Sequence, residues 1–207
     1  MSSALLIEVA SDVICPWCYI GKRRFEKSLR LLGGEVEATV SWLPFQLNPG
    51  MPPGGLARAE YRRAKFGSPE RARALDARVA QEGAGEGIHF AFDRMERTPN
   101  TFRAHQLIDL AQAQGCGAAV IDALFRDYFE DARDIGDAAV LAGIAVRCGV
   151  ARWPDAADAA RVAQLEEAVR ELGISGVPTF IFDRKSGISG AYPPEQLAAA
   201  IRQAAAV

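Results

Sequence analysis

Two cysteines stand close together near the start of the chain, in the run Cys15-Pro16-Trp17-Cys18. A short apolar segment, Leu5 to Ala10, precedes them and has the length and composition of a β-strand. The following residues, Tyr19 to Leu32, carry apolar side chains at helical spacing, and Gly33-Gly34 then provides a stop. We therefore expect the pair at a junction where a strand leads into a helix.

That junction would give the two thiols different roles. A thiol at the first turn of a helix faces unpaired backbone N–H groups and the positive end of the helix dipole, and both favour the thiolate. Cys15 is therefore the expected nucleophile. Pro16 suits the first turn, where a backbone N–H is not needed. The three-residue spacing brings Cys18 beneath Cys15, where it can resolve a mixed disulfide.

Other uses of the cysteines are less consistent with the sequence. A zinc site needs a second pair of ligands at short spacing, but Cys116 and Cys148 are 32 residues apart, and His89 and His105 are 16 apart. Haem attachment needs His directly after the second cysteine, and position 19 is Tyr. Two structural cysteines that lie near each other by chance are a third alternative. We expect no metal, and we expect Cys116 and Cys148 to be buried or inert thiols at helix ends, without activation by a dipole.

Composition excludes several classes of protein. With 207 residues, 49% of them hydrophobic and 24% charged, the chain has the proportions of a soluble globular protein. Lys and Arg total 24 against 26 Asp and Glu, so nucleic-acid binding is not expected. No segment approaches the roughly 18 to 20 apolar residues of a membrane span, and the first twelve residues lack a basic secretory region. We expect a cytoplasmic protein, where neighbouring cysteines favour metal binding or redox catalysis over structural disulfides.

The rest of the chain changes character twice. A strand is expected within residues 36–47, and a Pro/Gly-rich break follows it. Helices are expected over residues 56–66, 69–82, 100–114, 118–131, 138–148 and 154–172. Strands at 179–182 and 187–190 and a helix at 193–206 close the chain. The order is β-α-β, then helices, then β-β-α, which predicts an α/β fold with a helical insertion.

A second motif, Gly176-Val177-Pro178-Thr179-Phe180, opens the late strand. Proline at the first position of a strand cannot complete the ladder, so it needs an edge, a turn or a cis bond. Together with Cys-x-x-Cys on a β-α-β unit, this motif resembles the thioredoxin fold. The resemblance implies a cis Val177-Pro178 bond facing the cysteine pair, and a Val177 backbone that pairs with an extended substrate segment.

Further similarity runs through nearly the whole chain. It is carried by residues 12–22, by Asn100-Thr101 with Ala104-His105, and by Gly173 to Phe180 with Gly190-Ala191. These segments resemble the FrnE branch of the DsbA-like family. The resemblance implies a thioredoxin fold with a large all-helical insertion: residues 1–48 and 174–207 would form the thioredoxin-fold domain, and residues 49–173 the insertion.

The resemblance also implies a set of site residues. Cys15 and Cys18 would be catalytic, and Val177, Pro178 and Trp17 would bind substrate. The best-known periplasmic DsbA proteins carry His where Trp17 stands, so no imidazolium helps to hold the Cys15 thiolate here, and we expect a less oxidising pair than theirs.

Four more residues are candidates for a proton relay or for a site on the insertion. Glu8 and Asp12 are the carboxylates nearest the pair in sequence, although neither falls clearly into register. Their simpler roles are an exposed strand end for Glu8 and a charge at the helix entrance for Asp12. Asn100 is most simply a helix N-cap and His105 a packed or surface histidine, and only the resemblance raises them above these roles.

We therefore expect a thiol–disulfide oxidoreductase or disulfide isomerase with no bound cofactor. Its partners would be protein disulfides and dithiols, or glutathione as a co-substrate, and both a monomer and a homodimer stay open. The alternative is a glutathione-dependent isomerase or transferase, similar to 2-hydroxychromene-2-carboxylate isomerases or kappa-class transferases. Those isomerases typically have Ser where Cys15 stands, so the intact pair counts against this alternative. A non-catalytic binding module would be expected to lose one cysteine or the Pro178 loop, and neither is lost.

Overall fold

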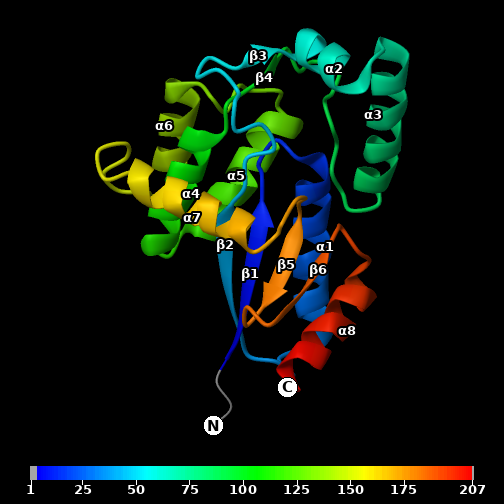
Figure 1. Ribbon diagram of the computed structural model, residues 1–207, viewed down its shortest axis with the longest axis vertical. Coiled ribbons are helices and arrows are strands. Elements are labelled where there is room, and N and C mark those ends of the chain that lie inside the picture. Colours follow the sequence, from blue (N-terminus) through cyan, green and yellow to red (C-terminus); the bar gives the residue numbers. More distant parts are fainter. Residues whose placement is uncertain (1–3, 207) are drawn as a thin grey trace. The chain divides into compact units, whose positions relative to one another are not determined.

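The computed structural model describes residues 4–206 and divides into two compact units (Figure 1). The first unit comprises the chain up to Phe45 together with the chain from Ala163 onward. The second unit is Gln46–Val162.

The first unit is built on a four-stranded sheet. Its strands are β1 (Leu5–Ser11), β2 (Ala38–Pro44), β5 (Thr179–Phe182) and β6 (Ser186–Ser189), in the order β2-β1-β5-β6. β1 runs parallel to β2 and antiparallel to β5, and β6 is antiparallel to β5. Helix α1 (Pro16–Leu32) connects β1 to β2, and α8 (Pro194–Ala205) follows β6 and packs against α1 (Figure 1). This is the expected thioredoxin-type order of elements.

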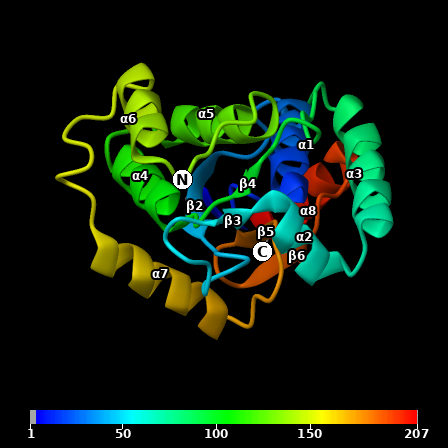
Figure 2. The ribbon, with the colours of Figure 1, turned by 90° about the horizontal axis from the view of Figure 1, so that it is seen from above.

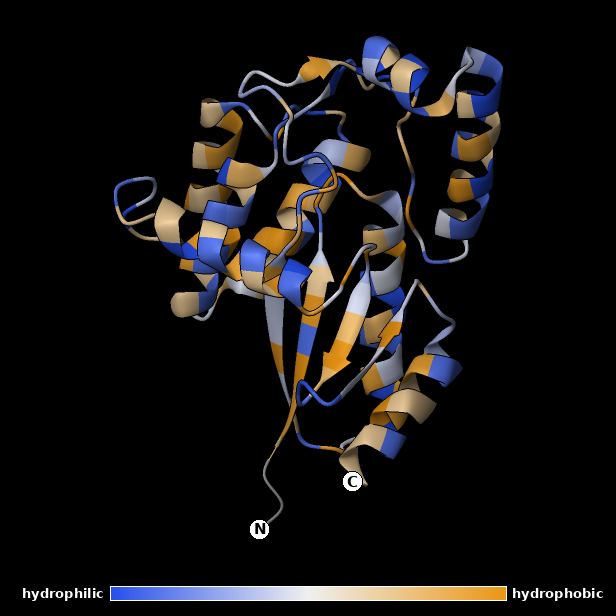
Figure 3. Cartoon of the chain, in the orientation of Figure 1, coloured by the Kyte–Doolittle hydropathy of each residue, from blue (hydrophilic) through white to orange (hydrophobic). Residues whose placement is uncertain are grey.

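The core of this unit lies between the sheet and the two helices. Side chains alternate across a strand, so Leu5, Ile7 and Val9 lie on one face of β1, and they pack in a cluster that includes Phe25 of α1 and Ile201 of α8. The rings of Phe25 and Phe180 lie 5.2 Å apart. Figure 3 shows β1 and β5 as mainly hydrophobic strands. Each large apolar side chain buried in this way contributes about 1.5–3 kcal/mol.

The turn between β5 and β6 is tied to the centre of the sheet. Asp183 and Arg184 adopt left-handed conformations there, with φ of 49° and 57°. The Asp183 N–H donates to the Leu6 carbonyl at 2.9 Å, and its carboxylate accepts from the Leu6 N–H at 2.9 Å. The hairpin is therefore fixed against β1 at the end of β5 that is farther from Pro178.

The second unit is mainly helical. Its elements are β3 (Leu56–Ala57), α2 (Arg58–Phe66), α3 (Pro69–Ala84), β4 (Arg97–Thr98), α4 (Phe102–Ala113), α5 (Gly117–Phe129) and α6 (Ala138–Arg147). Helices α4, α5 and α6 contact one another (Figure 2), and α2 packs on α3. Phe90 and Phe92 stack at 4.7 Å, and Phe129 meets Phe90 edge-on at 5.2 Å.

Helix α7 (Ala159–Glu171) begins later than the expected 154, because the Asp158 carboxylate accepts the Arg161 N–H at 2.9 Å and caps the helix there. The division between the units falls inside this helix, at Ala163. The Arg170 guanidinium lies 4.3 Å from the centre of the Phe45 ring, so the last turns of α7 pack within the first unit. Gly173, the expected boundary, marks only the end of the helix.

Two short strands were not expected from the sequence. β3 occupies the first two residues of the segment expected to be helical from residue 56, and β4 pairs with it through Leu56 opposite Thr98. The Arg58 N–H donates to the Glu96 carbonyl at 2.8 Å next to this ladder. Strands of two residues carry no periodicity, so only a distant partner reveals them. The strand expected within residues 36–47 is β2, which is shorter and covers residues 38–44.

Candidate active site

Cys15 is the N-cap of α1, with φ −90° and ψ 113°, and Pro16 begins the helix. The Cys15 N–H donates to the Asp12 carbonyl at 3.0 Å, which closes the turn after β1. The Cys15 carbonyl accepts the N–H of Cys18 at 3.0 Å and that of Tyr19 at 3.3 Å. The local sequence therefore places the first sulfur at a helix N-terminus, as the strand-to-helix junction predicts.

Both thiols of the pair are free, and both residues are buried, Cys15 with 5% and Cys18 with 1% of its surface exposed. The Cys15 thiol donates to the Val177 carbonyl at 3.7 Å. Burial is the main reason that the pKa of Cys18 lies well above its ordinary value, and the neighbouring Cys15 thiol raises that pKa further. Cys18 is therefore a neutral thiol at neutral pH, next to the Cys15 thiol.

The Val177–Pro178 loop lies beside the Cys15 sulfur. The peptide bond between these residues is cis. The loop is anchored to the β5–β6 hairpin, because the Pro178 carbonyl accepts the Gly190 N–H at 2.8 Å. The Thr179 hydroxyl, at the start of β5, donates back to the Gly176 carbonyl of the loop at 2.8 Å. Cys15, Cys18 and the Val177–Pro178 segment thus come together from distant parts of the sequence, with Trp17 half-buried in the first turn of α1.

Gly21 allows the close approach of this loop to α1. A Cβ atom at position 21 would lie 2.7 Å from Pro178 Cγ and 3.4 Å from Pro178 Cβ. No role was expected for this glycine, although a glycine inside a helix, three residues after Cys18, is a signal for such a contact. Gly21 therefore belongs to the structural frame of the site.

Glu8 is neither an exposed strand end nor directed at the cysteine pair. It is 3% exposed, and its carboxylate oxygens accept hydrogen bonds from Arg184 Nη2 at 2.7 Å and Nε at 2.8 Å. Alternation along β1 places Glu8 on the face opposite Ile7 and Val9, and those two residues pack toward α1. The exposed strand end expected for Glu8 is therefore corrected to a buried ion-pair partner of Arg184, and a proton-relay role for Glu8 stays a prediction.

Asp12 acts on the pair through its backbone. It is fully buried, and its backbone N–H lowers the pKa of Cys18, which favours the thiolate. Its carboxylate accepts the Ile14 N–H at 3.5 Å. A role for that carboxylate as a proton relay stays a prediction.

Asn100 and His105 belong to the second unit. The Asn100 side chain donates to the Met51 carbonyl at 2.7 Å and accepts the Phe102 N–H at 2.9 Å, while Thr101 occupies the N-cap position that Asn100 was expected to fill. Asn100 therefore caps the helix from one position earlier. His105 lies on α4 and is 3% exposed. A functional role for either residue stays a prediction.

The two remaining cysteines are half-buried rather than buried. Cys116 is the N-cap of α5, which corrects its expected place at a helix end without a dipole, and its thiol donates to the Ala111 carbonyl at 3.5 Å. Cys148 is the C-cap of α6, and burial raises the pKa of its thiol. Neither residue has a cysteine partner at Cys-x-x-Cys spacing.

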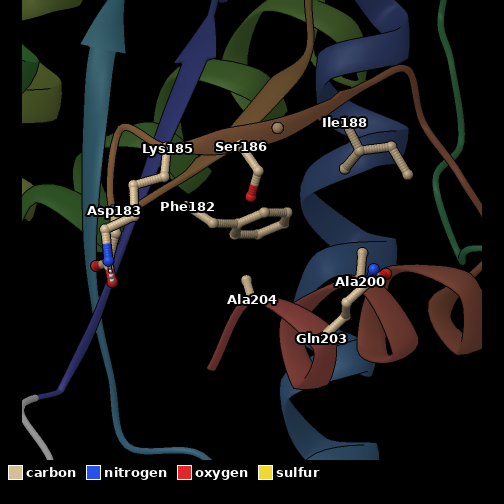
Figure 4. A pocket seen from close by; sticks show the side chains of 9 residues that line it. Phe182, Asp183, Lys185, Ser186, Ile188, Ala200, Gln203 and Ala204 are labelled. Carbon is tan, nitrogen blue, oxygen red and sulfur yellow. Dashed lines mark ion pairs between the residues drawn. The ribbon is translucent and has the colours of Figure 1, made fainter. Parts of the chain in front are cut away.

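A cavity of about 450 Å³ opens elsewhere in the first unit, between the β5–β6 hairpin and α8 (Figure 4). Phe182, Ile188 and Ala204 form part of its lining. Because Phe182 ends β5 and Pro178 precedes its first residue, the cavity and the cysteine pair lie at opposite ends of this strand. Within residues 4–206, no cluster of three or more His, Cys, Asp or Glu could hold a metal ion, and no helix is long and apolar enough to cross a membrane.

A family model described as a DSBA-like thioredoxin domain matches residues 6–202. The chain belongs to this DSBA-like family. A probable DsbA oxidoreductase from Streptomyces coelicolor, SCO1869, is 34% identical, with a TM-score of 0.87 over 97% of this chain and 89% of that chain. The uncharacterised Bacillus subtilis protein YwbO is 28% identical over 183 residues, which span 84% of this chain and 85% of YwbO.

More distant structures share the DSBA-like fold. The cytosolic disulfide reductase DsbM from Pseudomonas aeruginosa, in a structure with GSH, is 18% identical, with a TM-score of 0.66 over 98% of this chain and 100% of that chain. A 2-hydroxychromene-2-carboxylate isomerase is 16% identical, with a TM-score of 0.71 over 96% of this chain and 95% of that chain. These two likenesses show the fold alone.

Proposed function

We propose that the protein is a thiol–disulfide oxidoreductase in which Cys15 attacks and Cys18 resolves. The observation that carries this proposal is the unlike setting of the two sulfurs. Cys15 stands at the start of α1 beside the Val177 carbonyl, whereas Cys18 lies deeper as a neutral thiol that contacts Cys15. A nucleophile at a helix N-terminus with a resolving thiol next to it is the arrangement that dithiol–disulfide exchange requires.

The exchange takes place in two steps. The Cys15 thiolate attacks a substrate disulfide, so a bond forms between Cys15 and one substrate sulfur, and the other substrate sulfur leaves as a thiolate that takes a proton from water. Cys18 then loses its proton to water and attacks Cys15, which releases the second substrate sulfur and leaves a Cys15–Cys18 disulfide. The substrate gains the two electrons that the protein loses, and the reverse sequence oxidises a dithiol.

The substrate is proposed to be a protein disulfide or a glutathione disulfide. The fold is shared with a cytosolic disulfide reductase whose structure contains GSH, which supports a thiol partner of this kind and a cytoplasmic setting. Val177 presents its backbone beside the attacking sulfur, and Trp17 lies half-exposed in the same turn as the pair. We propose that these groups hold an extended disulfide-bearing segment against Cys15.

Single-cysteine variants test this function. Cys18→Ser should lose most of its reductase activity on a model protein disulfide and accumulate covalent complexes through Cys15, because only an outside thiol can then resolve the mixed disulfide. Cys15→Ser should lose both the activity and the complexes, whereas Cys116→Ser, the matched control in the second unit, should retain both. Wild-type protein that exchanges no disulfide would contradict the proposal.

A glutathione-dependent isomerase is the second candidate, favoured by the fold shared with the chromene carboxylate isomerase. Such catalysis places the sulfur of glutathione against a small electrophilic substrate and needs no resolving thiol. Turnover of a chromene carboxylate with glutathione that survives Cys18→Ser would support this candidate over the oxidoreductase.

A further inference from the structure

The face of β1 that points toward α1 ends in a polar residue. Leu5, Ile7 and Val9 form this face and pack against the helix that carries Cys18. Continuing the alternation by one step places Ser11, the last residue of β1, on the same face. Ser11 is therefore the polar side chain that β1 directs toward the resolving cysteine, while Glu8 lies on the other face.

The Ser11 hydroxyl is buried without a hydrogen-bond partner among the described residues. The residue is 6% exposed, and its backbone carbonyl is occupied by the Phe45 N–H at 3.2 Å. A buried hydroxyl that is left unpaired destabilises the folded protein, so a nearby polar atom that it can bind would offset this cost.

The pKa of Cys18 connects this hydroxyl to the resolving sulfur. Burial and the Cys15 thiol raise that pKa, whereas the Ser11 side chain and the Asp12 backbone N–H lower it. Of the charged side chains near Cys18 in sequence, Lys22, one turn along α1, pairs with Glu26, and the Asp12 carboxylate accepts the Ile14 N–H. The Cys18 thiolate thus depends on neutral donors rather than on a cation.

We propose that Ser11 is a further catalytic residue: its hydroxyl closes a hydrogen bond to the Cys18 sulfur as that sulfur ionises, and so places and stabilises the resolving thiolate. This inference rests on the proposed exchange function. Among residues 4–206 of the reduced protein the hydroxyl has no hydrogen-bond partner, so it can turn to the sulfur without breaking another bond.

The step in which Ser11 acts is the second half of the exchange. The Cys18 proton passes to water, the Ser11 O–H donates to the new thiolate, and this thiolate attacks Cys15. The bond between Cys15 and the substrate sulfur breaks, and the substrate leaves as a thiolate that takes a proton from water. Ser11 keeps its own proton throughout, so it is a donor and not a base.

The size of the effect follows from thiol reactivity. One hydrogen bond to a charged group shifts the pKa of that group by on the order of one unit. Losing it would reduce the thiolate fraction about tenfold, but nucleophilicity rises with basicity at a Brønsted slope of about 0.4–0.5. Attack of Cys18 on the mixed disulfide should therefore slow about three- to fourfold at neutral pH. At a pH above the pKa of Cys18, the variant should react as fast as the parent or faster.

Ser11→Thr and Ser11→Val form a matched pair, because both add the same branch to the strand and only Thr keeps the hydroxyl. In a Cys116→Ser/Cys148→Ser parent, reaction with 5,5′-dithiobis(2-nitrobenzoate) should release one coloured thiolate when Cys15 attacks and a second when Cys18 resolves. We expect Val to slow the second release three- to fourfold relative to Thr and to move its pH profile upward. Glu8→Gln, on the opposite face of β1, should leave that profile in place.

The outcomes separate the two proposals. Equal rates and equal pH profiles for Thr and Val would overturn the role of Ser11 and leave the exchange function standing. A parent that releases no second thiolate would overturn the exchange function, and the role of Ser11 with it. If the branched variants do not fold, Ser11→Ala in a background whose single cysteine is Cys18 decides the matter. The pKa of that thiol, followed by its ultraviolet absorbance, should rise in the variant. An unchanged pKa would overturn the inference.

Discussion

At the scale of single residues, the two sulfurs of the pair lie in different settings. Cys15 lies at the start of α1, where backbone N–H groups point outward, and its thiol meets the Val177 carbonyl. Cys18 is surrounded by protein and is kept neutral by burial. In the proposed exchange, the first sulfur is the one that attacks, and the second ionises only when it resolves the mixed disulfide.

The raised pKa of Cys18 makes the stability of the reduced protein depend on pH. Its pKa in the folded state lies above the ordinary value of about 8.5, so its contribution to stability is complete below that pH and is lost as the pH rises through the folded pKa. We expect the free energy of unfolding of the reduced protein to fall above about pH 9, by at most about 1.4 kcal/mol per pH unit from this group. Denaturant unfolding across alkaline pH measures the effect.

Cys18→Ser is the control for this dependence, because it removes the titrating thiol and leaves Cys15, Cys116 and Cys148 in place. Its unfolding free energy should fall less steeply in the same pH range. Parallel curves for the reduced wild type and Cys18→Ser would contradict the buried, neutral state of Cys18.

At the scale of elements, the site depends on how closely the Pro178 loop approaches α1. Helix α1 is fixed to the sheet by Phe25, and the loop is fixed by the hydrogen bonds of Pro178 and Thr179 to the hairpin. The two elements meet at Gly21, where the position of a Cβ atom would fall 2.7 Å from a rigid proline ring. Their fit therefore sets the distance between the Val177 carbonyl and the Cys15 sulfur.

Gly21→Ala should disturb this fit. Alanine favours helix formation over glycine by up to about 1 kcal/mol, but forcing Cβ against Pro178 costs about 1–3 kcal/mol, so we expect net destabilisation together with slower disulfide exchange. Gly143→Ala in α6 is the matched control, because Arg147 Nη1, the neighbour of its Cβ position, is 3.6 Å away. It should leave the protein as stable or more stable. A Gly21→Ala protein that behaves like Gly143→Ala would show that the loop does not need the glycine.

Elements with a strong local pattern could be predicted from the sequence. The predicted strand 179–182 matches β5, and α1 begins at Pro16 and ends before Gly33 as its signals indicate. Residues whose role depends on a distant partner could not be predicted. Glu8 has the sequence context of an exposed strand end, and only its ion pair with Arg184 explains its burial. Gly21 has a role only because Pro178 lies against it. The candidate nucleophile and the proline loop were found from sequence because both are local motifs, whereas Ser11 required the facing of β1 to be known.

At the scale of the whole molecule, the relative stability of the oxidised and reduced forms sets the direction of exchange. A strongly oxidising pair owes its potential to a stabilised reduced form. Here the Cys15 thiol meets a carbonyl and the thiol of Cys18, and neither of these groups carries a positive charge. Cys18 adds no stabilised thiolate at neutral pH. The reduced form should therefore gain little over the oxidised one.

We accordingly expect the Cys15–Cys18 disulfide to have a reduction potential between about −270 and −200 mV, well below the roughly −120 mV of DsbA, and the oxidised protein to be at least as stable as the reduced one. Equilibration with glutathione buffers, acid quenching and alkylation in a Cys116→Ser/Cys148→Ser background gives the potential. Denaturant unfolding of both forms gives the difference in stability between them. This difference must match the difference in potential between the folded and the unfolded cysteine pair, at about 1.4 kcal/mol per 30 mV. Trp17→His, which can add an imidazolium next to the pair, should move the potential toward that of DsbA and reverse the order of stability. A wild-type potential near −120 mV, with the reduced form the more stable, would show that the fold stabilises the Cys15 thiolate by a means other than a neighbouring cation.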